Sequence, residues 1–159
     1  MILLTVGTQL PFDRLVKLVD DWARRNPETD ILAQIAEGEY QPQHMDYVKY
    51  LDEQQYAKAF ESASVILAHA GMGTVISSLI NSKPVIVYPR RASLGEHRNE
   101  HQLATCSKLA HLKGCYVAYE PEQLYQFLDD LNSLEGGEIG PYANDDLIDT
   151  IDRFITQQT

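Results

Sequence analysis

The chain has 159 residues, of which 44% are hydrophobic and 23% charged, and its formal net charge is −10 at pH 7. This length suits one domain with a substantial core. The acidic balance argues against a general nucleic-acid binder, which needs a basic face to contact phosphates.

Cysteine usage and the apolar runs indicate a soluble protein. The two cysteines, Cys106 and Cys115, lie outside any CxxC pair, so we expect reduced thiols in a cytosolic protein. The first residues lack the basic region of a signal peptide, and no apolar run approaches the roughly 20 residues of a membrane span.

The first part of the chain alternates strand and helix patterns. The apolar run Ile2–Val6, followed by a glycine, predicts a buried parallel strand. The stretch 13–25 carries an apolar helical stripe, and Asp13 is expected to cap it. The next predicted elements are strands at 30–36 and 47–50 and a helix at 52–63.

The same alternation continues to the end of the chain. The predicted elements are a strand at 64–71, a helix at 74–82, a strand at 84–89, a polar loop at 90–102, a helix at 99–114 that ends at Gly114, a strand at 115–119 and a helix at 120–134. This order predicts one Rossmann-like, doubly wound parallel α/β sheet over residues 1–134. Residues 135–159 are expected to form a flexible link and a C-terminal helix.

Three loops of unusual composition follow predicted strands. They are Gly7-Thr8-Gln9, His69–Thr74 and Pro89–Gln102. Ligands of open α/β sheets bind at the carboxyl ends of the strands, so we expect these loops to converge on one site.

The second loop, His-Ala-Gly-Met-Gly-Thr, has two interpretations. Its glycines allow close backbone approach and positive φ, and the following helix offers unpaired N–H groups to a phosphate, with Thr74 as cap or hydroxyl donor. Alternatively it is an ordinary strand–turn–helix junction capped by Thr74. The loop contains neither Gly-Lys-Ser/Thr nor GxGxxG, which argues against ATP hydrolysis and ordinary dinucleotide binding.

The loop at 90–102 is rich in hydrogen-bonding side chains. Asparagine, glutamine and glutamate here could hold sugar hydroxyls while arginine or histidine takes charge; the alternative is a solvated charged loop. His97 and His101 lie four residues apart, but no cysteine or HExxH pattern accompanies them, so we predict no zinc site. Arg14, one turn into the first helix, is expected at the surface.

Four stretches together carry a family resemblance. "TVGTQLPFDRLV", "ILAHAGMGT", "KPVIVYPR" and "NEHQLATCSKLAHLK" resemble the C-terminal, donor-binding half of family 28 GT-B glycosyltransferases, from Met1 to about Leu131. The chain is most similar to free-standing small subunits of split UDP-sugar transferases. Such subunits occur in the transferase that adds the second sugar in N-glycan assembly and in bacterial capsule and exopolysaccharide synthesis.

The resemblance implies that residues 1–134 bind a UDP-sugar and that the anomeric centre is inverted without a metal or cofactor. The diphosphate would lie over His69–Thr74 and the Thr8 loop, and the uracil and ribose near the 37–50 loop and the helix after Gly73. The sugar hydroxyls would meet Asn99, His101 and Gln102. His69 is the candidate catalytic residue, as a local base or as a group that orients phosphate. The implied substrate-binding residues are Gly7, Thr8, Gln9, Ala70, Gly71, Met72, Gly73, Thr74, Arg90, Glu96, Asn99, His101 and Gln102.

The resemblance also implies a partner. A membrane-anchored subunit would bind the lipid-linked glycan acceptor and supply the general base, and it would hold this cytoplasmic chain at the inner face of the membrane. No nucleic-acid partner is expected. Two alternatives remain: a non-catalytic UDP-binding regulatory partner, and a fragment of a UDP-sugar epimerase, which is disfavoured because epimerases need both halves in one chain.

Overall fold

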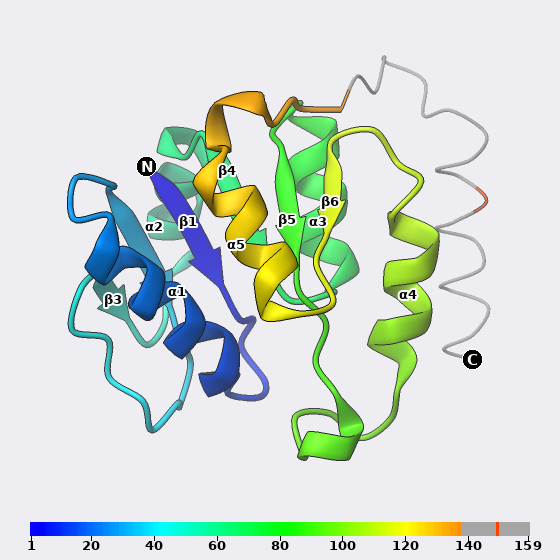
Figure 1. Ribbon diagram of the computed structural model, residues 1–159, viewed down its shortest axis with the longest axis horizontal. Coiled ribbons are helices and arrows are strands. Elements are labelled where there is room, and N and C mark those ends of the chain that lie inside the picture. Colours follow the sequence, from blue (N-terminus) through cyan, green and yellow to red (C-terminus); the bar gives the residue numbers. More distant parts are fainter. Residues whose placement is uncertain (138–148, 150–159) are drawn as a thin grey trace.

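The computed structural model describes residues 1–137 and 149, so most of the predicted link and the predicted C-terminal helix lie outside the described residues. Six parallel strands form one sheet in the order β3-β2-β1-β4-β5-β6 (Figure 1). This order confirms the predicted doubly wound α/β fold. The strands are β1 (Ile2–Thr5), β2 (Ile31–Gln34), β3 (Asp46–Val48), β4 (Val65–Ala68), β5 (Val85–Val87) and β6 (Cys115–Val117).

Helices cover both faces of the sheet. In Figure 1, α1 and α5 lie in front of the sheet, while α2 and α3 lie behind it. The helices are α1 (Asp13–Arg25), α2 (Glu53–Ser62), α3 (Met72–Ile80), α4 (His101–Leu109) and α5 (Pro121–Asp129), with short 3₁₀ helices η1 (Ala92–Leu94) and η2 (Leu131–Ser133). Within the described residues, no helix combines the length and apolar character needed to cross a membrane.

Each face of the sheet has its own apolar core. On β1, Ile2 and Leu4 pack with residues of α1 and α5, whereas Leu3 packs with residues of α2, α3 and α4. A strand covered on both sides is largely apolar, which is why β1 is apolar except at Thr5, whose buried hydroxyl donates to Gln34 Oε1.

Two predicted helices have different ends in the structure. The helix expected at 74–82 begins at Met72 with Gly71 as its N-cap, so Thr74 lies inside the first turn and does not cap it. The helix expected at 99–114 ends at Leu109, because a tight turn with an i→i+3 bond from the Leu112 N–H follows.

Asp13 is the first residue of α1 and not its cap. Phe12 is the N-cap and makes no side-chain capping bond. Asp13 Oδ2 instead accepts a 3.1 Å hydrogen bond from the Glu39 N–H, so this carboxylate holds the 36–39 turn against the start of α1.

A second aspartate holds the rest of that loop. The Asp20 carboxylate is 1% exposed and accepts hydrogen bonds from the Tyr40 hydroxyl (2.6 Å) and from the N–H groups of Gln43 and His44. Burial opposes ionisation of Asp20, but these donors outweigh it and lower the pKa below its usual value.

Candidate functional site

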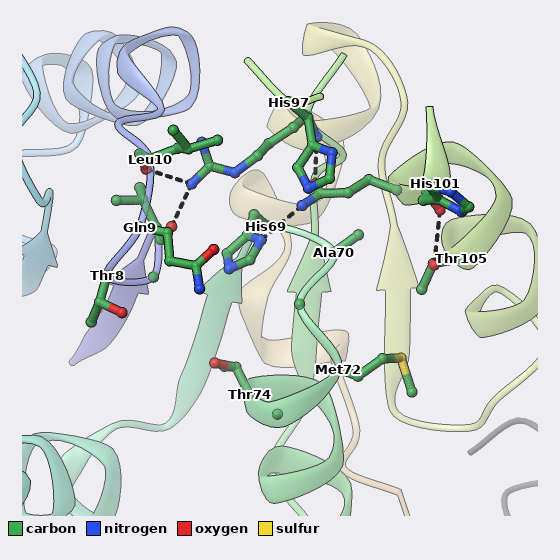
Figure 2. Close-up of a pocket in the computed structure, with 16 residues that line it drawn as sticks. Thr8, Gln9, Leu10, His69, Ala70, Met72, Thr74, His97, His101 and Thr105 are labelled. Carbon is green, nitrogen blue, oxygen red and sulfur yellow. Dashed lines mark hydrogen bonds between the residues drawn. The ribbon is translucent and has the colours of Figure 1, made fainter. Parts of the chain in front are cut away.

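A pocket of about 610 Å³ opens at the carboxyl ends of β1, β4 and β5. All three predicted loops contribute to its walls, as the doubly wound topology requires. Figure 2 shows His69 in the middle of the labelled side chains, with Thr8 and Gln9 on one side and His101 and Thr105 on the other. The lining residues are Val6, Gly7, Thr8, Gln9, Leu10, His69, Ala70, Gly71, Met72, Gly73, Thr74, Arg90, His97, His101, Gln102 and Thr105.

The N-terminal end of α3 forms one wall of the pocket. Helix geometry leaves the N–H groups of Met72, Gly73 and Thr74 without carbonyl partners inside the helix, and the positive end of the helix dipole lies there too. A Cβ built on Gly73 would have no heavy atom within 4 Å. This position therefore keeps open space above the helix end.

Two other glycines make room for His69. Gly7 has φ +80°, and a Cβ there would lie 2.9 Å from His69 Nε2. A Cβ on Gly71 would lie 2.5 Å from Cε1 of the same ring, although the φ of Gly71 is an ordinary −91°. The loop glycines were expected to allow close backbone approach and positive φ; neither Gly71 nor Gly73 adopts positive φ, and of the pocket glycines only Gly7 does.

His69 is electrically neutral at physiological pH. Burial disfavours the charged ring, and the nearby positive charge of Arg90 and the ring of His97 add to the effect, so the pKa of His69 falls to about 4. Its Nδ1 lies 3.1 Å from Nε2 of Gln102.

Arg90 holds the first loop in place. Its side chain is 3% exposed, and its guanidinium donates to the backbone carbonyls of Val6, Leu10 (2.7 Å) and Pro11 (2.6 Å). Burial lowers the pKa of Arg90 to about 10, which still leaves it positively charged at neutral pH. Arg90 therefore contributes charge to the pocket while its hydrogen bonds order residues 6–11.

Glu96 and Asn99, two of the predicted substrate-binding residues, do not line the pocket. Glu96 accepts two hydrogen bonds from Arg14 (2.7 and 2.9 Å) and one from the Arg91 N–H. Asn99 Oδ1 instead accepts from the His101 N–H at the start of α4. All other predicted site residues line the pocket. Of the two places expected for the uracil and ribose, the helix after Gly73 contributes Thr74 to the lining, whereas residues 37–50 contribute nothing.

The Arg14 side chain, expected at the surface, instead connects two segments of the chain through hydrogen bonds. Besides Glu96, its guanidinium donates to the Tyr88 hydroxyl (2.7 Å) and to the Pro89 carbonyl (3.0 Å). These bonds tie the start of α1 to the segment after β5. The prediction missed this role because the partners are more than 70 residues away in sequence.

Four lining residues were not predicted: Val6, Leu10, His97 and Thr105. Thr105 follows His101 by four residues, so it lies on the same side of α4, and helical spacing could have identified it. None of the sixteen lining residues is an aspartate or glutamate. Within residues 1–137 and 149, no three His, Cys, Asp or Glu side chains are grouped so that they could hold a metal ion.

Comparisons with known proteins agree with this fold. The chain is similar in structure to the glycotransferase of kitacinnamycin (TM-score 0.61, 18% identity, 83% of this chain and 34% of that one). It is also similar to MurG of Acinetobacter baumannii (TM-score 0.55, 18% identity, 82% and 42%), so the chain spans less than half the length of either protein. No curated protein matches the sequence. The family model for the glycosyltransferase family 28 C-terminal domain matches residues 1–136, and the chain therefore belongs to that family.

Proposed function

We propose that this chain binds the UDP-sugar donor of an inverting glycosyltransferase. The observation that carries the proposal is the pocket above the N-terminal end of α3, which combines free backbone N–H groups, Thr8 and Thr74 hydroxyls and no carboxylate. Backbone donors at a helix N-terminus suit a diphosphate, and a carboxylate in the same pocket would repel it.

The proposed chemistry follows from these donors. An acceptor hydroxyl attacks the anomeric carbon, the bond from that carbon to the diphosphate oxygen breaks, and UDP leaves with one more negative charge. The N–H groups of residues 72–74 and the Thr74 hydroxyl would stabilise that charge as it develops. We therefore propose a transfer that needs no metal ion, which predicts that EDTA leaves UDP affinity unchanged.

The general base is proposed to come from a second subunit. The acceptor hydroxyl must lose its proton, and among the described residues no carboxylate lines the pocket to take it. A membrane-anchored subunit that also binds a lipid-linked glycan, in exopolysaccharide, capsule or lipid-linked glycan synthesis, is the partner that the family resemblance favours. This chain would then lie against the cytoplasmic face of the membrane.

The same missing carboxylate favours a second candidate, a regulatory subunit that binds UDP without turnover. The two candidates differ in one result. Saturable UDP binding with sugar transfer in the presence of the acceptor-binding subunit supports the transferase. Saturable binding without transfer under the same conditions supports the regulator.

Calorimetric titration tests the donor proposal. UDP should bind, UMP should bind more weakly because it lacks the second phosphate, and NAD should not bind. Thr74→Val should weaken UDP roughly tenfold or more, since a hydrogen bond to a charged group is lost. Thr29→Val is the matched control, because Thr29 precedes β2 at the opposite edge of the sheet. Binding of NAD alone, or equal UDP affinity in both variants, would contradict the proposal.

A further inference from the structure

The side chain of Gln102 joins two groups in the wall of the pocket. Gln102 is 6% exposed, its Oε1 accepts a 2.7 Å hydrogen bond from the Arg90 N–H, and its Nε2 lies 3.1 Å from His69 Nδ1. Both ends of the carboxamide are therefore engaged within the protein. One N–H and one oxygen lone pair of the carboxamide remain for a sugar hydroxyl, the role expected for Gln102.

The contact with Arg90 determines how the carboxamide is oriented. A backbone N–H only donates, so the Gln102 atom that faces it has to be the oxygen. The NH₂ group then faces His69, and because that group only donates, His69 Nδ1 has to be the acceptor. A neutral imidazole with an unprotonated Nδ1 carries its proton on Nε2.

His69 Nε2 lies on the side of the ring that Gly7 and Gly71 leave free. Cβ atoms at these glycines would lie 2.9 and 2.7 Å from Nε2, so no side chain there could coexist with the ring. Within the described residues, Nε2 has no hydrogen-bond partner. The ring lines the pocket close to the N-terminal end of α3, as Figure 2 shows.

We propose that Gln102 is a positioning residue: anchored by the Arg90 N–H, it holds His69 in the tautomer that carries its proton on Nε2. His69 then presents a fixed, uncharged hydrogen-bond donor to an anionic oxygen of the ligand. This arrangement also argues against His69 as a general base, since Nδ1 is engaged and Nε2 already carries a proton. The identity of the ligand rests on the proposed function, whereas the tautomer does not.

The tautomer can be read directly by long-range ¹H–¹⁵N NMR on the full chain at pH 7 without ligand. The His69 signals are identified by their loss in His69→Gln. We expect Nε2 to be protonated in at least tenfold excess over Nδ1. Excess protonation of Nδ1, or an even mixture, would overturn the proposal without any variant being made.

Gln102→Glu keeps the size of the side chain but replaces the NH₂ group that faces His69 with a carboxylate oxygen. The carboxylate can still accept from the Arg90 N–H, but it also accepts from His69. In the neutral ring the proton should therefore move to Nδ1, and the ring should gain its second proton at a higher pH than in the unsubstituted chain. Gln102→Leu removes both bonds and should give a tautomer mixture. Gln9→Glu is the matched control, because it adds the same charge to the pocket at a residue with no hydrogen bond to His69. An unchanged tautomer in Gln102→Glu would overturn the proposal.

A pH series of UDP titrations gives the functional readout. The charged or titratable groups facing His69 are Arg90 and His97, and His101 lines the same pocket. The control variant keeps all three. At pH 8, Gln102→Glu should bind UDP at least tenfold more weakly than Gln9→Glu, and the gap should close toward pH 6 as the ring gains its second proton. A gap that does not change with pH would overturn the donor role of His69. The expected tautomers without UDP binding in any variant would overturn the proposed function and support the positioning role.

Discussion

Substitutions at Gly73 are expected to change UDP affinity and the free energy of unfolding in opposite directions. It is the second residue of α3, its φ is not positive, and a Cβ there would meet no heavy atom within 4 Å. Alanine is favoured over glycine in a helix by about 0.5–1 kcal/mol, and valine by less. Gly73→Ala should therefore raise the free energy of unfolding by up to that amount and the melting temperature by roughly 1–4 °C.

The same substitutions should weaken the ligand, because the new methyl groups occupy the space above the helix end. We expect UDP affinity to fall about tenfold in Gly73→Ala and about a hundredfold in Gly73→Val, or about 1.4 and 2.7 kcal/mol. Thermal unfolding and calorimetry on the same samples measure both effects.

Gly95→Ala is the control for this pair. A Cβ on Gly95 also meets open space, but φ is +72° and the residue does not line the pocket. This variant should lose about 1–2 kcal/mol of stability and keep its UDP affinity. A lower melting temperature in Gly73→Ala would refute the account of α3, and unchanged UDP affinity in Gly73→Val would refute the placement of the diphosphate.

Three further results are expected. Asp20→Asn should lower the free energy of unfolding at pH 7 by about 2–3 kcal/mol. Because the folded-state pKa of Asp20 is depressed, its contribution to stability is present above about pH 4 and is lost as pH falls through that pKa. Urea unfolding should therefore show the stability difference between the two proteins disappearing in acid. A double-mutant cycle of Arg14→Met and Glu96→Gln should give a coupling energy of about 1–2 kcal/mol in the same assay, and a value near zero would show that the pair does not order the loops. Burial raises the pKa of Cys106 and Cys115 to about 12, so Ellman's reagent should label neither thiol before unfolding.

The fold was predictable because its signals are local. The run Ile2–Val6 is apolar except at Thr5, a pattern that favours a strand covered on both faces, and helix patterns follow such runs repeatedly. The ends of helices were less predictable. Threonine is a common N-cap residue, but the helix begins at Met72, directly after a tight turn in which the Gly71 N–H donates to the His69 carbonyl at 2.7 Å.

The position of the candidate site at the sheet edge was predictable, but the identity of all its lining side chains was not. Parallel strands bring their carboxyl ends to one edge, so the convergence of Gly7, His69 and Gln102 follows from topology. Which polar side chains face the pocket depends on long-range partners. Glu96 is held outside the pocket by its bond to Arg14. Because Arg14 lies 82 residues earlier in the chain, no spacing rule could have predicted this pair.

The pocket contains the positive charge of Arg90 and, within the described part of the chain, no acidic lining residue, whereas the chain as a whole has a net charge of −10. The structure explains this difference. None of the sixteen residues that line the pocket is acidic, and salt screens charges that lie farther from a ligand than the Debye length of about 8–10 Å at physiological ionic strength. Glu96 lies in the same loop as the buried Arg90, but it does not line the pocket. Its carboxylate accepts hydrogen bonds from Arg14 and from the Arg91 N–H. At short range the pocket therefore offers backbone N–H groups, the end of a helix dipole and Arg90. An acidic protein can bind a diphosphate in this way because local donors, and not the net charge, determine the potential that the ligand meets.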